Sequence, residues 1–369
     1  MSSAAINLTE SFTRAVITKL KEEIFTMNEF NREDIFANLE YDVQNSDMPE
    51  TLKNKMLTNI LHLREQKINI MITGATGSGK SSTINAMFNA DVAKVGVGVD
   101  PETMSIEKYT LHNLVLWDSP GLGDGKEADN RHARNIINKL AECDSSGKAL
   151  IDLVLVILDG STRDLGTSYE LINQIIIPNL GPNKSDRILV AINQCDVAMK
   201  GKHWDHERNM PDNVLKEFLD EKVQSVRRRI KEGTGVDVEP IYYSAGYKES
   251  EYDKQNPYNL SKLLYYIIQH TPKEKRLVYI DNVPNNKPEL WRDNDDLKDY
   301  SNEIKKTWAE TVIEHVTSGV ETGAEIGKSI GGMFGKTGEM IGGALGGFVG
   351  AVGGFISGAI STIGSWFGF

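Results

Sequence analysis

Residues Gly74 to Ser81 read Gly-Ala-Thr-Gly-Ser-Gly-Lys-Ser. The glycines let the backbone turn tightly enough to bring successive N–H groups against phosphate oxygens. We expect Lys80 to reach the β- and γ-phosphates of a nucleotide, and the Ser81 hydroxyl to ligate Mg²⁺. This stretch therefore predicts a phosphate-binding loop.

The residues on either side of the loop supply the elements that must hold it. Ile68–Thr73 is a short apolar run rich in β-branched residues and is typical of a strand, and the spacing of Ile84 and Phe88 after the loop is helical. A strand, a glycine-rich turn and a helix start are the context that the motif needs, and the helix N-terminus adds partial positive charge.

A second chemical motif, Asp118-Ser-Pro-Gly121, follows the apolar run Leu114–Trp117. We expect Asp118 to stand behind Mg²⁺, usually through a water, and the Gly121 N–H to face the γ-phosphate. The two motifs together predict a site for a nucleoside triphosphate and its metal.

Two further segments predict which base is bound. Asn193-Gln-Cys-Asp196 ends the apolar run Ile188–Ile192, and Ser244-Ala-Gly246 ends the next one. Asp196 can accept two hydrogen bonds from the N1–H and N2–H₂ of guanine, a pattern that adenine cannot offer. We expect the Ala245 N–H to bond guanine O6. Open α/β sheets bind ligands at the carboxyl ends of their parallel strands, so these segments can meet at one site.

Apolar runs and amphipathic stretches alternate between residues 67 and 270. The expected strands are Ile68–Thr73, Leu114–Trp117, Leu153–Leu158, Ile188–Ile192 and Ile241–Tyr243, and the expected helices lie near 127–141, 166–177, 213–230 and 259–269. Strands without polar alternation are buried on both faces. The pattern therefore predicts an α/β fold with a mostly parallel sheet flanked by helices.

The chain outside this region is expected to be helical. Apolar stripes at helical spacing comprise Leu8, Phe12, Val16, Leu20 and Ile24, then Leu52, Met56, Ile60 and Leu63, and finally Leu297, Tyr300, Ile304, Trp308, Val312 and Val316. We assign residues 1–66 to a helical N-terminal segment, 67–270 to the nucleotide-binding domain, 271–317 to a linker and an amphipathic helix, and 318–369 to a tail.

The tail is unusual in its glycine content. Seventeen of the 33 glycines lie between Gly319 and Gly368, and no charged residue occurs in the 30 residues Met340–Phe369. Small residues four apart let membrane helices approach closely, and roughly 20 apolar residues span a hydrocarbon core. We expect a helical glycine-zipper tail that associates with membrane lipid. The alternative is a flexible or self-packed soluble tail.

Charge and cysteine usage narrow the partners and the compartment. The net charge is −11 without a long basic run, which argues against a nucleic-acid partner. Cys143 and Cys195 are far apart and have no CxxC partner, so we expect a reducing, cytoplasmic compartment. The first residues show no signal-peptide pattern.

Taken together, the motifs resemble the Era-like branch of the translation-factor-related GTPases, over about residues 50 to 270. The wording of Gly79–Phe88 and of Trp117–Asp124 is most similar to small GTPases carried on bacterial prophages and mobile elements. The resemblance implies a P-loop G domain that binds GTP or GDP with Mg²⁺ and hydrolyses GTP. In that family a switch threonine ligates Mg²⁺ and senses the γ-phosphate, and Thr103 is the position that matches.

One set of site residues follows from the motifs and the resemblance. Lys80, Thr103 and Gly121 are the expected catalytic residues, and Ser81, Thr103 and Asp118 are the expected Mg²⁺ ligands. Nucleotide contacts are expected at Gly74, Ala75, Thr76, Gly77, Ser78, Gly79, Lys80, Ser81, Ser82, Asp118, Asn193, Gln194, Asp196, Ser244 and Ala245. His203 and His206 lack a third ligand of matching spacing, so we expect a solvated loop there and no metal site.

Three positions depart from the family pattern. Gln194 replaces the usual lysine of the guanine motif, so we expect weaker binding rather than a change to adenine. Leu122 stands where Ras-type enzymes carry the glutamine that orients the attacking water, and Gly77 replaces the asparagine of potassium-activated relatives. We therefore expect slow hydrolysis, or hydrolysis that depends on a partner, on a homo-oligomer or on a residue from another loop.

The combined expectation is a membrane-associated nucleotide switch. GTP and Mg²⁺ would order the loops around Thr103 and Gly121, and the helices of 8–66 and 297–316 would transmit that state to the tail. One alternative is a membrane-perturbing or pore-forming effector that the G domain restrains. Another is a ribosome-associated assembly GTPase, but the acidic charge and the lack of a recognisable RNA-binding module after residue 270 count against it.

Overall fold

The computed structural model describes residues 35–46, 50–88, 106–123, 125–248, 254–280, 282–283, 291, 298–316 and 318. The chain divides into two compact units. Residues 66–304 form one, called the sheet unit, and the residues up to 65 form the other, called the helical unit, with those from 305 onward. Helix α10 (Tyr300–Val316) begins in the sheet unit and continues in the helical unit.

The sheet unit is built on six strands in the order β2-β3-β1-β4-β5-β8. All neighbouring pairs are parallel except β2 and β3, which are antiparallel. The strands are β1 Ile68–Gly74, β2 Glu107–Leu111, β3 Leu114–Asp118, β4 Leu153–Asp159, β5 Ile188–Asn193 and β8 Ile241–Tyr242. The predicted α/β fold with a mostly parallel sheet is thereby confirmed. Strand β2 was not predicted, because its side chains at the sheet edge are exposed or half-buried and form no apolar run.

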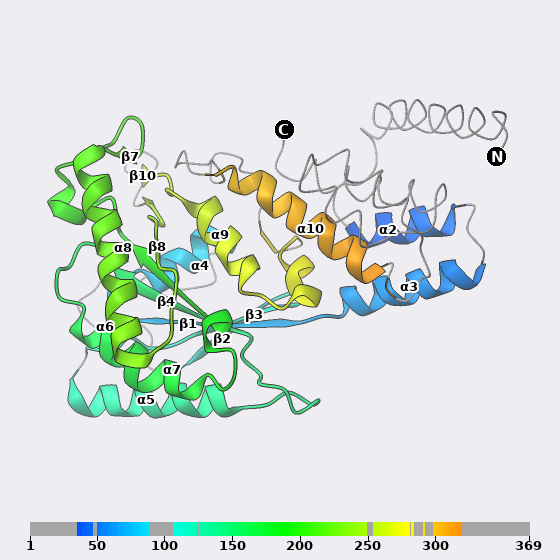
Figure 1. Ribbon diagram of the computed structural model, residues 1–369, viewed down its shortest axis with the longest axis horizontal. Helices are drawn as coiled ribbons and strands as arrows, with labels where there is room; N and C mark the ends of the chain where they lie inside the picture. The colour runs from blue at the N-terminus through cyan, green and yellow to red at the C-terminus, as the bar shows by residue number, and fades with distance from the viewer. Residues whose placement is uncertain are drawn as a thin grey trace. The chain divides into compact units, whose positions relative to one another are not determined.

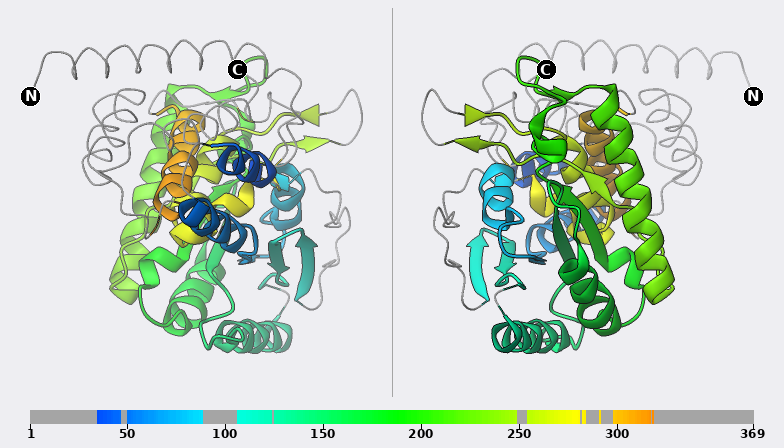
Figure 2. Two further views of the ribbon diagram at one scale, coloured as in Figure 1. Left: turned by 90° about the vertical axis from the view of Figure 1, so that its right-hand side faces the viewer. Right: turned by 90° about the vertical axis from the view of Figure 1, so that its left-hand side faces the viewer.

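Helices flank this sheet on both faces, with α8 on one side and α4 on the other in Figure 1 and Figure 2. The helices are α4 Lys80–Phe88, α5 Lys126–Ala141, α6 Gly166–Glu170, a π-helical segment Leu171–Ile176, α7 Ile177–Asn179, α8 Asn213–Thr234 and α9 Leu260–Gln269. A 3₁₀ turn, Lys184–Arg187, leads into β5. These bounds agree with the helices expected from the sequence.

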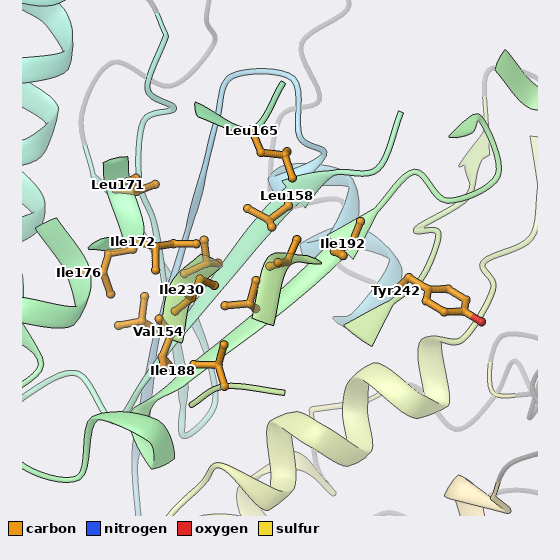
Figure 3. Packing of buried hydrophobic residues seen from close by; sticks show 14 of the residues in the cluster. Val154, Leu158, Leu165, Leu171, Ile172, Ile176, Ile188, Ile192, Ile230 and Tyr242 are labelled. Atoms are coloured by element: carbon orange, nitrogen blue, oxygen red, sulfur yellow. The ribbon is translucent and has the colours of Figure 1, made fainter. Parts of the chain in front are cut away.

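One apolar cluster fills the space between the sheet and helices α5 to α8 (Figure 3). The strands contribute residues such as Val154, Ile188 and Ile192, and the helices contribute Leu171, Ile176 and Ile230. Side chains alternate along a strand, so the buried Leu155 and Ile157 of β4 serve the opposite face. Burial of both faces explains why these strands read as unbroken apolar runs.

Two short hairpins interrupt the alternating pattern. The first pairs β6 (Trp204–Asp205) with β7 (Met210–Pro211) and follows a 3₁₀ turn, Ala198–Gly201. The second pairs β9 (Tyr247–Lys248) with β10 (Lys254–Gln255). Strands of two residues carry no periodicity, so the sequence did not predict them.

The segment after residue 270 continues the sheet unit. A 3₁₀ helix, Lys273–Tyr279, buries Leu277 and Tyr279. Its Lys275 Nζ lies 2.6 Å from Asp152 Oδ1, and the other oxygen of Asp152 accepts a hydrogen bond from Asn69 N at 2.9 Å. This partly buried ion pair fixes the segment to the amino ends of β1 and β4.

The helical unit contains α2 (Ile35–Gln44), α3 (Glu50–Arg64) and the later part of α10. The predicted stripe of α3 is buried at Met56, Ile60 and Leu63, and that of α10 at Trp308, Val312 and Val316. Asn59 Nδ2 donates to Val316 O at 2.9 Å, so residues from the two ends of the chain meet in this unit.

Two predicted features fall elsewhere. The stripe from Leu8 to Ile24 and the glycine-rich segment 319–369 lie outside the described residues. Among the residues that are described, no helix is both long and apolar enough to cross a bilayer.

Candidate functional site

The phosphate loop connects β1, which ends at Gly74, to α4, which begins at Lys80. Gly79 has a φ of +86°, and a Cβ there would collide with the Asn193 side-chain amide, so only glycine fits. Lys80 Nζ donates to Gly74 O at 3.4 Å and to Ala75 O at 3.1 Å. The lysine is therefore folded back over its own loop, at the position where it can exchange carbonyls for phosphate oxygens.

Several polar atoms around this loop are buried without a hydrogen-bond partner among the described residues. They are Thr73 Oγ1, Ser78 Oγ and Asp118 Oδ1. The other oxygen of Asp118 accepts from Ser81 Oγ at 3.5 Å. Buried polar groups are normally hydrogen-bonded, so these atoms suit a polar ligand. A hydroxyl beside a carboxylate is also a ligand pair that suits Mg²⁺.

Burial governs the charge of Asp118, which ends β3 and is 0 % exposed. Desolvation raises the pKa of Asp118 to about 6, nearby Glu107 adds to the rise, and Lys80 opposes it. Ionisation of the buried Asp118 carboxyl therefore costs free energy when no metal ion is bound. A metal at Ser81 and Asp118 would offset that cost.

The segment after Asp118 lies directly against the phosphate loop. Thr76 N donates to Leu122 O at 3.2 Å, and Ala75 and Leu122 form a parallel bridge. Gly121 has no room for a Cβ beside Thr76. The Leu122 side chain is 4 % exposed and packs in the apolar cluster, so it orients no water.

His132 is a buried contact of this segment that the sequence reasoning missed. Its Nδ1 lies 2.9 Å from Gly121 O. A carbonyl oxygen only accepts, so Nδ1 carries the proton, and Nε2 is buried without a partner among the described residues. A signal was present, because His132 shares the buried stripe of α5 with Ile136 and Leu140.

The base-side loops are tied to the phosphate loop by Asn193, which is 2 % exposed. Asn193 Nδ2 donates to Ser78 O at 3.0 Å, and its Oδ1 accepts from Ala245 N at 2.9 Å. The Ala245 N–H, which the sequence predicts to meet guanine O6, is donated to Asn193 in this structure. Asn193 therefore acts as a brace between two loops.

Gln194 and Asp196 follow on the same loop. Gln194 adopts a left-handed conformation with φ +59°, and its Nε2 donates to Gly77 O at 2.8 Å. Asp196 is 7 % exposed. Ser244 exchanges two backbone hydrogen bonds with Tyr258, at 3.0 and 2.9 Å. The predicted base-binding residues thus lie on loops that are tied to the phosphate loop.

A second link was also missed, between α4 and the end of β8. Thr83 Oγ1 lies 2.8 Å from Gly79 O and 2.7 Å from the Tyr243 hydroxyl, and the Thr83 and Tyr243 side chains are buried. Thr83 has one hydroxyl proton and donates it to Gly79 O, so Tyr243 donates to Thr83. The phosphate loop is thereby held from behind by the same strand that leads to Ser244.

The remaining predicted residues are placed as follows. Ser82 lies half-buried in the first turn of α4. Thr103 lies in the stretch 89–105, outside the described residues. His203 Nδ1 lies 2.8 Å from Asp212 Oδ2, and no cluster of metal-ligating side chains occurs in the part of the chain that the structure describes.

The sequence of this chain is similar in part to known GTPases and to uncharacterized proteins. A model of the 50S ribosome-binding GTPase family matches residues 69–194. The uncharacterized protein YkfA of Escherichia coli is 28 % identical over 157 residues, which cover 42 % of this chain and 50 % of YkfA. Mouse Interferon-inducible GTPase 1 is 35 % identical over 79 residues, 20 % of this chain and 19 % of that protein. The chain thus spans about half the length of YkfA.

A solved structure of Toc33 from Arabidopsis thaliana, in complex with Mg²⁺ and GMPPNP, is also similar. It shares 15 % identity and a TM-score of 0.37, over 57 % of this chain and 85 % of Toc33. The family match over residues 69–194, the sheet order and the motifs at the strand ends together support a P-loop GTPase domain in this part of the chain.

The raised pKa of Asp118 predicts how stability depends on pH. The folded protein holds this proton up to about pH 6, whereas a free aspartate loses it near 3.8, so stability is present below pH 4 and is lost as pH rises through 6. We expect Asp118→Asn to remove this loss. Between pH 5 and 7.5 the nucleotide-free wild type should lose about 1 to 2 kcal/mol more unfolding free energy than the variant, measured by urea titration without Mg²⁺. Equal losses in the two proteins would show that Asp118 ionises freely.

Proposed function

We propose that the protein binds GTP and GDP with Mg²⁺, hydrolyses GTP, and uses the change of nucleotide as a switch. The observation that carries this proposal is the Asn193 side chain, which bonds Ser78 O of the phosphate loop and Ala245 N of the base-side loop. One side chain that holds a phosphate end and a base end together suits a ligand that has both parts, which is a nucleotide.

The phosphate end fits a triphosphate and its metal. Lys80 would neutralise the β- and γ-phosphates, and Ser81 and Asp118 would supply hydroxyl and carboxylate oxygens to Mg²⁺. Mg²⁺, when bound, offsets negative charge on the phosphate oxygens. The buried Ser78 hydroxyl and the second oxygen of Asp118 would then gain partners that no other described residue gives them.

The base end favours guanine. Asp196 is nearly buried, so the paired N1–H and N2–H₂ donors of guanine would replace water at its carboxylate. Because the Ala245 N–H is donated to Asn193, discrimination against adenine rests mainly on Asp196. Gln194 lies across Gly77 and would cover the base with its aliphatic part, as expected from the sequence.

Hydrolysis is proposed to be slow in the isolated chain. The position that carries a water-orienting glutamine in Ras-type enzymes is a packed leucine here, Leu122. Thr103 is proposed to complete the metal shell and sense the γ-phosphate. Faster turnover would need a residue from an activating partner, from a second copy of the chain or from another loop.

The output of the switch is proposed to be membrane association in the cytoplasm, through residues 318–369. Support comes from the glycine spacing and the 30 uncharged residues of Met340–Phe369. The contact of Asn59 with Val316, in the helical unit, brings the N-terminal helices to the chain just before this tail. No observation in the described residues favours the pore-forming or the ribosomal alternative.

Asp196→Asn tests the guanine assignment by changing what the site accepts. An asparagine donates one hydrogen bond and accepts one, which matches xanthine, whose O2 replaces the guanine amino group. We expect the affinity for GDP to fall about 10-fold or more while that for XDP rises, measured by titration of fluorescent nucleotides. A misfolded variant would lose both ligands. Unchanged GDP affinity in a folded variant would refute the assignment.

The membrane proposal predicts nucleotide-dependent flotation with liposomes. The full chain should float more with a non-hydrolysable GTP analogue than with GDP, because the ordered loops would release the tail. A chain lacking 318–369 should remain at the bottom of the gradient with either nucleotide. Flotation that persists without the tail, or that ignores the nucleotide, would contradict the proposal.

A further inference from the structure

The β6–β7 hairpin contains none of the proposed nucleotide-binding residues. It contacts the segment 255–258, which packs against the base-side loop Ser244–Gly246. We propose that Asn209 and Trp204, on this hairpin, are positioning residues that set the guanine specificity of the site. They would act through the segment 255–258 and not by touching the nucleotide. This inference rests on the proposed binding of a guanine nucleotide.

The base-side loop Ser244–Gly246 has few attachments of its own. It follows β8, which pairs with β5 through Ile241 and Tyr242, and Tyr243 adds backbone bonds to Ile192 O at 2.9 Å and from Cys195 N at 3.3 Å. Beyond that strand, the loop is held on one side by Asn193 and on the other by the paired backbone of Tyr258, at 3.0 and 2.9 Å. On the side away from Asn193, the position of Tyr258 therefore helps to fix where the loop lies.

Gly246 brings the base-side loop into direct contact with the segment 255–257. Its φ is +67°, and a Cβ at this position would collide with the backbone of residues 255–257. The loop thus rests directly on that segment, with no side chain between them to take up movement. A shift of 255–258 would be passed to Ala245 and to its bond with Asn193.

The hairpin holds this segment by two contacts. Asn209 Nδ2 donates to two successive carbonyls, Asn256 O at 2.9 Å and Pro257 O at 3.1 Å. The buried Trp204 ring meets the Tyr258 ring edge to face, with centroids 5.1 Å apart. Figure 1 shows β7 and β10 at the same end of the sheet unit, in keeping with these contacts.

The same hairpin is also joined through the backbone to Asp196, the second side of the proposed base site. The chain leaves Asp196 and reaches β6 through Met199, Lys200 and Gly201, which have left-handed φ values of 53°, 66° and 69°. Such conformations are unfavourable for residues with a Cβ and persist only where the surroundings determine them. The turn between β6 and β7 is fixed by Asp205 Oδ1, which accepts from the backbone N–H groups of Glu207 and Arg208, at 3.0 Å each.

The β6–β7 hairpin therefore connects Asp196 with the segment 255–258, which supports Ala245. If the hairpin lost its contacts with residues 255–258, Asp196 and Ala245 could move independently of each other. The guanine contacts would weaken more than the phosphate contacts, because the phosphate loop is also held by β1 and α4.

Asn209→Gly tests this with little change to the backbone, since glycine accepts the left-handed φ of 53° at this position. The chain offers a matched control in Asn183→Gly. Asn183 also has φ 53°, and it lies before the amino end of β5, away from the base site. Asn209→Asp is a second variant, which keeps the size but sets a carboxylate against two carbonyls.

The readout is the affinity for GDP, for inosine diphosphate, which lacks the 2-amino group, and for inorganic tripolyphosphate. Asn209→Gly should weaken GDP by about 3- to 10-fold and lower the GDP-to-IDP preference, with a clearly smaller change for tripolyphosphate. Asn209→Asp should weaken GDP further, and Asn183→Gly should match the wild type on all three ligands.

The inference fails if Asn209→Gly and Asn183→Gly bind GDP alike, or if Asn209→Gly weakens GDP and tripolyphosphate equally, as general destabilisation would. A wild type that binds tripolyphosphate but not GDP would refute the proposed function, and this inference with it. A wild type that prefers GDP, with an unaffected Asn209→Gly variant, would refute the inference alone.

Discussion

The site depends on the two hydrogen bonds of the Asn193 side chain. Its amide nitrogen donates to Ser78 O and its amide oxygen accepts from Ala245 N, so both functions of the side chain are used and its orientation is fixed. The bonds join loops that leave β1 and β8, which lie three positions apart in the sheet. They also explain Gly79, because the amide occupies the space that any larger residue would need. A carboxylate at position 193 would lack the donor for Ser78 O.

A second constraint is the buried carboxylate of Asp118. Its pKa is raised because the side chain is buried, so the ionised carboxylate is unfavourable in the nucleotide-free protein. Such a group is retained where a ligand makes use of it, and here Ser81 stands beside it. Gly121 and Leu122 follow Asp118 and pack on the phosphate loop, so the proposed metal site and the proposed phosphate site are joined through adjacent backbone. His132 adds a hold on Gly121 from α5.

Much of this could be predicted from the sequence because buried parallel strands leave unbroken apolar runs. Each expected strand is present, and the motifs lie at their carboxyl ends as predicted. The edge strand β2 and the two-residue strands of the hairpins lack such a signal. The hydrogen-bond partners of Asn193, His132 and Asn209 were not foreseeable for a different reason, although the spacing of His132 with Ile136 and Leu140 indicated that His132 is buried. Their hydrogen bonds join residues 11 to 115 positions apart, and only the tertiary fold brings these together.

The central claim is that this P-loop GTPase domain holds a guanine nucleotide between its phosphate loop and Asp196. Calorimetric titration of the nucleotide-free protein with GDP and with ADP, each with Mg²⁺, tests it most directly. The account predicts saturable one-to-one binding of GDP, with ADP weaker by about 100-fold or more, because adenine offers Asp196 no paired donors. Equal affinity for the two nucleotides, or tighter binding of ADP, would contradict it.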